Sequence, residues 1–179
     1  MQNFLLMKPT KKAEDLSADF GYAETLFIDR DFVIITGENR KKVVNEISRA
    51  HGKLTIYRAA SEEMLRFVLE KTAVNIVVGI ESIHKKDSLH YLRGGLDQVL
   101  CRITADRNKI IAFSFSDIVQ AKNREKLLAR MMANLKLCQH FKVKTLFSGF
   151  FTDLKDFRSA SDLAAFLSVL QQNDRNIFA

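Results

Sequence analysis

Residues that usually form flexible linkers are scarce in this sequence, which contains one proline, seven glycines and no low-complexity tract. Linkers between domains are commonly rich in such residues, so nothing marks a point at which to divide the chain. Its 179 residues also match the size of one ordinary domain. We therefore expect a single domain over residues 1–179.

Long apolar runs are absent as well. A transmembrane helix needs about 20 consecutive apolar residues, and no stretch of this sequence approaches that length. The N-terminal segment MQNFLLMKPTKK has no positively charged region ahead of its short apolar run, so it lacks the layout of a secretory signal. We expect a cytoplasmic protein with no membrane partner.

Cysteine and histidine are few and scattered. Cys101 and Cys138 lie in apolar helical patterns outside any CxxC or Cys/His cluster, which favours buried free thiols over a disulfide, a metal site or a nucleophile. Of the four histidines only His84 and His90 share a loop, and the sequence contains no HExxH, GxSxG, P-loop or dinucleotide fingerprint. We expect no catalytic residue, metal or cofactor in this chain.

Short apolar and β-branched runs recur along the chain and predict buried strands. They occupy residues 3–7, 32–36, 54–58, 74–80, 110–115 and 145–150, with a weaker seventh at 26–28. Helical patterns lie between them, at 43–50 behind an Asn39 cap, after Ser61, at 125–141 and at 160–170. This alternation predicts an α/β fold with parallel βα units and right-handed crossovers.

An open doubly wound sheet and a closed barrel share this alternation, and periodicity does not separate them. No Gly-rich phosphate loop follows any predicted strand, and the strands are evenly spaced, which favours a barrel slightly. Acidic residues follow several strands, and barrel active sites gather at the C-terminal ends of strands. These acidic candidates are Asp29, Asp31, Glu81 and Asp117.

Positive charge is concentrated in the second half of the chain. Residues 81–179 hold 16 Lys and Arg against 10 Asp and Glu, so they carry +6 of the formal charge of +7. Residues 120–144 alone hold seven Lys and Arg against one acid, Glu125. Such a composition is typical of a surface that faces a polyanion, although a solvated helix face would have it too.

The segment ESIHKKDSLHYLRGGLDQVL at 81–100 combines cations, an aromatic ring and a diglycine. Lys and Arg can neutralise phosphates, and Tyr91 can stack on an unpaired base. Gly94 and Gly95 could let a phosphate approach the N-terminus of the following helix, whose free N–H groups favour anions. The alternative is a solvated loop with Tyr91 packed inward.

Within this segment, KDSLHYLRGGLDQVL closely resembles the mid-chain signature of the archaeal ribonuclease P protein component three family. The resemblance continues in the family's order through later segments. These are IIAFSFSD at 110–117, RMMANLKLC at 130–138, TLFSGF at 145–150 and FRSASDLAAFLSVL at 157–170. In the last segment the family usually reads Arg-Ser-Pro-Arg-Asp-Leu, so Arg158 carries over but the second arginine is replaced by Ser161.

The resemblance implies a TIM-barrel-like fold, related to the PHP family of metal-dependent phosphoesterases but without their metal ligands. Because six or seven strands are predicted against eight in a complete barrel, we expect it to be trimmed or partly open. It also implies a protein that binds the ribonuclease P RNA, the catalyst that uses Mg²⁺ to remove the 5′ leader from precursor tRNA. The implied partners are that RNA, precursor tRNA through the complex, and a small subunit of α/β-sandwich type.

The candidate RNA-binding residues combine the basic segments with the family's turn. They are Lys85, Lys86, His90, Tyr91, Arg93, Arg124, Arg130 and Arg158. One alternative is a metal-dependent barrel phosphoesterase that uses the strand-end carboxylates with His84 or His90. Another is a protein-interaction module whose basic face meets an acidic partner.

Overall fold

The structure, a computed structural model, describes residues 1–50 and 52–172. Its strands all pair in parallel, and they form a pair, β1–β2, and a sheet in the order β3-β4-β5-β6-β7. The strands are β1 (Gln2–Leu5), β2 (Glu24–Phe27), β3 (Phe32–Ile35), β4 (Leu54–Arg58), β5 (Ile76–Val78), β6 (Ile110–Ser114) and β7 (Lys144–Ser148). Every strand predicted from the apolar runs is therefore present, including the weaker one near residues 26–28.

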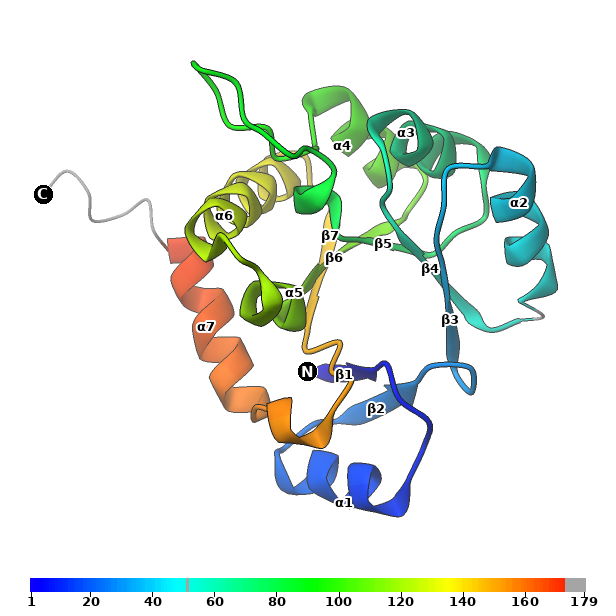
Figure 1. The fold of residues 1–179 in the computed structure, drawn as a ribbon, viewed down its shortest axis with the longest axis vertical. Helices are drawn as coiled ribbons and strands as arrows, with labels where there is room; N and C mark the ends of the chain where they lie inside the picture. The colour runs from blue at the N-terminus through cyan, green and yellow to red at the C-terminus, as the bar shows by residue number, and fades with distance from the viewer. Residues whose placement is uncertain (51, 173–179) are drawn as a thin grey trace, which may run out of the picture.

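Helices connect most of the strands and lie outside them (Figure 1). They are α1 (Lys11–Asp19), α2 (Arg40–Arg49), α3 (Glu62–Lys71), α4 (Gln98–Asp106), α5 (Phe115–Gln120), α6 (Arg124–His140) and α7 (Ala160–Gln172), with 3₁₀ turns η1 (Ile80–Ser82) and η2 (Leu154–Asp156). The Asn39 and Ser61 side chains accept from the amides of Lys42 and Met64, as the predicted caps require. Helix α1 was not predicted, because only Ala13 and Ser17 of its residues are buried and its apolar stripe is too thin to read.

The two sheets join into a ring of strands (Figure 1). At one seam the amide of Leu6 donates to the carbonyl of Phe151 over 2.8 Å, which places β1 beside the end of β7. At the other seam Ile28 at the end of β2 bridges to Phe32 at the start of β3. The described residues thus form seven strands around the ring, against eight in a complete barrel, and the seams hold few hydrogen bonds compared with the ladders inside each sheet. The prediction of a trimmed TIM-like barrel is confirmed.

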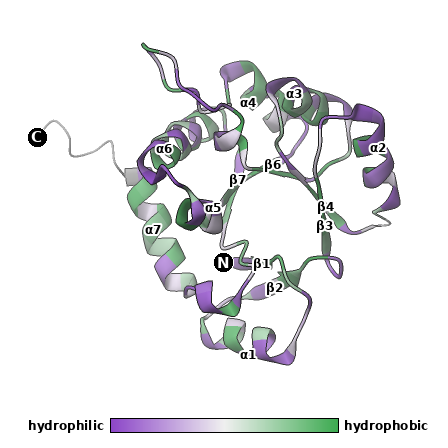
Figure 2. Ribbon diagram, in the orientation of Figure 1, coloured by the Kyte–Doolittle hydropathy of each residue, from purple (hydrophilic) through white to green (hydrophobic). Residues whose placement is uncertain are grey.

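Apolar side chains fill the ring and the layer between strands and helices. Inside the ring, Phe4 packs on Phe32 and Phe150 with ring centroids 5.3 and 5.5 Å apart. Figure 2 shows hydrophobic residues along the strands and hydrophilic residues on outer helices such as α2. The Cys101 and Cys138 thiols are buried and free, as predicted.

No helix in the described ranges combines the length and the apolar composition needed to cross a membrane.

Candidate nucleic-acid interface

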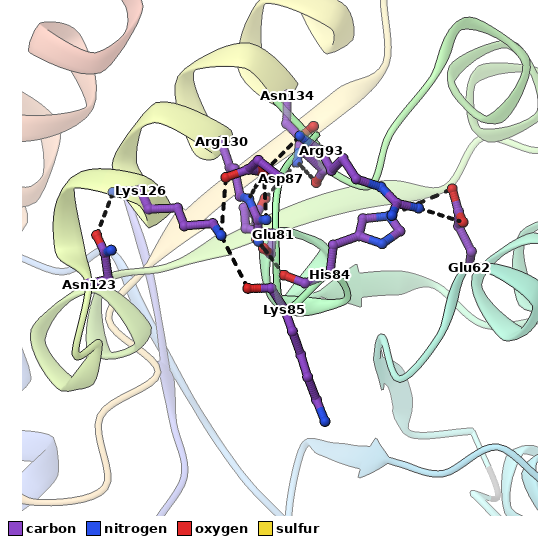
Figure 3. Close-up of polar contacts among 11 residues, drawn as sticks. Glu62, Glu81, His84, Lys85, Asp87, Arg93, Asn123, Lys126, Arg130 and Asn134 are labelled. Atoms are coloured by element: carbon purple, nitrogen blue, oxygen red, sulfur yellow. Dashed lines mark hydrogen bonds and ion pairs between the residues drawn. The ribbon is translucent and has the colours of Figure 1, made fainter. Parts of the chain in front are cut away.

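Residues 83–97 form a long loop that leaves the ring after η1 and returns to α4, and it projects from the body of the molecule (Figure 1). Its base is fixed to helix α6 by Arg130 (Figure 3). The guanidinium of Arg130 donates to Asp87 over 2.6 and 2.9 Å, and to the carbonyls of Glu81 and His84, each over 2.7 Å. This arginine therefore joins both ends of the 81–87 segment to one helix.

Asp87 is the acidic centre of this network. Its carboxylate accepts from Arg130, from the ammonium of Lys126 over 3.1 Å and from the backbone N–H of Arg93 over 2.9 Å. Partial burial acts to raise the pKa of Asp87, but these three donors outweigh it and hold the pKa at about 2. The carboxylate is therefore ionised at neutral pH and draws the far side of the loop, at Arg93, back to α6.

The two glycines have a packing role that was not inferred from the sequence. A Cβ on Gly94 would lie 2.5 Å from the side-chain oxygen of Asn134, and one on Gly95 would lie 2.6 Å from the carbonyl oxygen of Ile80. Moreover, Asp97 caps α4 by accepting from the amide of Leu100, which places a negative charge at that helix N-terminus. The glycines thus allow close packing of the loop on η1 and α6. Both also line a pocket with Arg93 and Asp97 at the start of α4, and the approach of a phosphate to this helix stays a prediction.

Gly95→Ala is expected to lower the free energy of unfolding by about 2 kcal/mol or more, since Gly95 combines a φ of +91° with the close carbonyl of Ile80. Gly21→Ala is the matched control, because Gly21 has a φ of +76° but no atom within 4 Å of the added Cβ. Urea unfolding of both variants measures the difference. Equal losses would show that backbone conformation alone, and not packing, requires Gly95.

Most of the predicted RNA-binding residues lie on the solvent side of the loop. Lys85, Lys86, His90 and Tyr91 are exposed, and Tyr91 exposes 65% of its surface, which excludes the alternative of an inward-packed ring. Arg93 is half-buried, with one guanidinium nitrogen 3.8 Å from Glu62. The loop thus presents cations and a stacking surface together.

The other three predicted arginines behave differently from one another. Arg124 is exposed at the start of α6 and donates to the carbonyl of Val119 over 2.8 Å. Arg130 has only 4% of its side chain exposed, and its donors are occupied as described above, so its prediction as a direct RNA contact is corrected to a positioning role. Arg158 is exposed in the turn between η2 and α7. This turn, orange in Figure 1, lies on a different side of the ring from loop 83–97, so the structure does not bring these two regions together.

Two polar residues that were not chosen from the sequence, Arg58 and Asn134, lie beside the loop with the strand-end acids Glu81 and Asp117. Arg58 at the end of β4 pairs with Asp117 after β6 through two hydrogen bonds of 3.0 and 3.2 Å. Glu81, only 1% exposed, accepts from the Asn134 amide over 3.0 Å. Burial raises the pKa of Glu81 to about 7, although its own backbone N–H and Asn134 oppose this. The ends of strands were the only sequence signal for these residues.

The strand-end acids do not assemble as a metal centre would require. Asp31 lines a cavity at the opposite end of the ring, with Gln2 and Leu54 from the starts of their strands. Asp117 is already paired with Arg58, and His84 lies 3.6 Å from Glu62 on a different element. Among the residues that the structure describes, no three His, Cys, Asp or Glu side chains are grouped to hold an ion. The carboxylates therefore do not fit the phosphoesterase alternative.

Comparisons with known proteins were made in sequence and in structure. No family model matches the chain. The protein named Ribonuclease P protein component 3 of Methanococcus maripaludis strain C6 is 24% identical over 149 residues, which cover 78% of this chain and 61% of that protein. The protein of the same name from strain C5 is 24% identical over 140 residues, with 76% and 58% covered. This chain thus spans about three fifths of the length of the curated relatives it matches.

Two solved structures share the fold. A chain in a cryo-EM structure of archaeal ribonuclease P with mature tRNA has a TM-score of 0.71 at 19% identity, covering 94% of this chain and 74% of that chain. A crystal structure of an uncharacterised protein has a TM-score of 0.51 at 9% identity, covering 90% of this chain and 42% of that one. The chain is therefore similar in sequence, over about three quarters of its length, to proteins named Ribonuclease P protein component 3, and the family resemblance found in the sequence is confirmed.

Proposed function

We propose that this chain is a protein subunit of ribonuclease P, which binds the catalytic RNA and supports removal of the 5′ leader from precursor tRNA without catalysing the cleavage. The observation that carries the proposal is the sequence match to component 3 over most of the chain, together with the fold shared with a chain of an archaeal ribonuclease P structure. The exposed cations and the 65% exposed Tyr91 of loop 83–97 support it, because they are suited to phosphates and unpaired bases.

The physical role of the chain would be electrostatic. An RNA that folds into a compact catalyst must bring phosphates together, and a protein with an excess of Lys and Arg offsets their repulsion. Mg²⁺ bound by the RNA does the same, so the protein and Mg²⁺ should partly substitute for each other. The chain itself would hold no cofactor.

The proposed partners follow from the same role. They are the ribonuclease P RNA, precursor tRNA reached through the complex, and a small ribonuclease P subunit of α/β-sandwich type. We also propose that residues 1–179 act as one domain and that the complex works in the cytoplasm.

A reconstituted cleavage assay tests the function. The protein alone should not cleave precursor tRNA, whereas adding it to the cognate RNA and the small partner subunit should raise the cleavage rate, most strongly at low Mg²⁺. Unchanged rates at low Mg²⁺ would contradict the proposal. Cleavage by the protein alone that a chelator abolishes would favour the metal-dependent phosphoesterase instead.

Arg93 and Arg158 should contribute more to RNA binding than exposed cations elsewhere. Each guanidinium is carried by a loop after a strand and is restrained by nearby groups: Arg93 by Glu62, and Arg158 by the carbonyls of Asp156 and Phe157. Restraint of this kind lowers the entropy cost of a bidentate phosphate contact. Each change to Ala should weaken binding by about 1 kcal/mol or more.

Lys11→Ala and Lys53→Ala are the controls for this prediction, because both lysines are exposed and lie outside these loops. Filter binding across a salt series provides the measurement. For the wild type, log K should fall with log salt at a slope of about −2 to −4, as expected for three to five neutralised phosphates. If the two lysine variants lose as much affinity as the arginine variants, binding is diffuse.

A further inference from the structure

A polar cavity of about 340 Å³ opens at the C-terminal ends of the strands, between the base of loop 83–97 and the turn that precedes α6. Arg58, Lys85, Lys126 and Arg130 are its cationic lining residues, and Glu81 and Asp117 are its acidic ones. The cavity is separate from the exposed tip of the loop, which carries His90 and Tyr91 and does not line it.

The charges in and around this cavity do not cancel. Asp117 is paired with Arg58, and Asp87 is shared by Lys126 and Arg130. Even with Glu81 ionised, the four cations therefore exceed the three acids by one charge. The remaining cation is Lys85, whose ammonium makes no hydrogen bond or ion pair in the described part of the chain. Figure 3 shows its side chain extended away from the network. The residues in and around the cavity therefore carry excess positive charge.

The hydrogen-bond donors of the cavity are also only partly used. Arg58 uses two of its five guanidinium donors in hydrogen bonds to Asp117, and its side chain is 34% exposed. The ammonium of Lys126 donates to Asp87 and to the carbonyl of Lys85, each over 3.1 Å, which leaves one of its three donors. Lys85 retains all of its ammonium donors.

We propose that this cavity binds a phosphate group of an RNA strand, with Lys85, Lys126 and Arg58 donating to its oxygens. Donors carried by three separate segments, β4, loop 83–97 and α6, together with excess positive charge, match a phosphate, whose oxygens accept many charge-assisted hydrogen bonds. They do not match a metal ion, which these cations would repel. The assignment to RNA rests on the proposed function, and it is supported by the exposed Lys86 next to Lys85, which could contact a neighbouring phosphate of the same strand.

The first test uses inorganic phosphate as the probe, with the full ¹⁵N-labelled chain at constant pH and ionic strength. Amide signals from residues 81–85 and 121–127 should shift on titration. Lys85→Gln should weaken this binding about tenfold, the scale of a lost charge-assisted contact. Lys53→Gln is the control and should leave it unchanged, because Lys53 is exposed, does not line the cavity and is not among the predicted RNA-binding residues. Absence of shifts, or equal losses in both variants, would overturn the proposal.

A second variant distinguishes the loss of a phosphate ligand from a loss of binding caused by altered folding. Asp117→Asn removes the carboxylate that competes for Arg58, so it should strengthen phosphate binding severalfold. Weaker binding in this variant would contradict the assigned ligands.

A third arm uses the ribonuclease P RNA itself. RNA at saturation should shift the same cavity signals and prevent further change on adding phosphate. If RNA binds but leaves these signals unmoved, the cavity takes free phosphate only and the inference is wrong while the proposed function stands. If RNA does not bind at all, the proposed function fails, and the phosphate titration still reports on the cavity.

Discussion

Arg130→Met should destabilise the protein by about 3 to 5 kcal/mol, the usual scale for removing one partner of a buried ionic network. The side chain of Arg130 is almost fully buried, and its guanidinium makes four hydrogen bonds to the 81–87 segment. Methionine fills similar space but donates to none of these acceptors, so the buried carbonyl of Glu81 loses a partner that water cannot easily replace. The base of loop 83–97 should also become more mobile as the free energy of unfolding falls.

Urea unfolding measures the global effect, and limited proteolysis reports on loop 83–97. Arg124→Met is the control, since Arg124 lies on the same helix but is exposed and donates only to the carbonyl of Val119. A loss below about 1 kcal/mol for Arg130→Met, no larger than that expected of a surface change, would mean that the network does not hold the loop. RNA binding by this variant should fall as well, because the cations of the loop would lose their fixed positions.

Glu81→Gln should stabilise the protein at pH 8 and have little effect near pH 4. Burial raises the folded-state pKa of Glu81 from 4.5 to about 7. The folded state therefore binds this proton more tightly than the unfolded state does. The stabilisation that protonated Glu81 provides is complete below pH 4.5 and is lost as the pH rises through 7. Glutamine carries no charge to bury and can still accept from Asn134, so the variant avoids this loss.

The expected gain at pH 8 is up to about 3 kcal/mol, because one pKa unit corresponds to roughly 1.4 kcal/mol. The measurement is the free energy of unfolding in urea at pH 4, 6 and 8 for wild type and variant. Glu125→Gln serves as the control, since Glu125 is exposed at the start of α6. A difference between wild type and Glu81→Gln that stays constant across this range would show that Glu81 has the same pKa in the folded and unfolded states and that burial does not govern it.

The strands and most helices could be predicted from the sequence because their signals are local. Strand β4, for example, alternates Leu54 and Ile56 into the ring with Thr55 and Tyr57 outward, and all of these fall within one short run. The caps at Asn39 and Ser61 depend on an amide three residues away. The ring itself was favoured only weakly, since its closure depends on Leu6 meeting Phe151 at the other end of the chain.

The roles of the polar residues were decided by tertiary structure. Arg130 resembled the other cations of the basic segment 120–144, but its partners Glu81 and Asp87 come from residues more than 40 positions earlier. The packing role of Gly94 and Gly95 depends on Asn134 and Ile80, which lie against them only in the folded chain. Arg58 and Asp117 are 59 positions apart and meet only because β4 and β6 flank β5 in the ring. A sequence pattern records which face of an element is apolar, but whether a charge on that element meets a partner, solvent or another charge depends on segments that are distant in the chain.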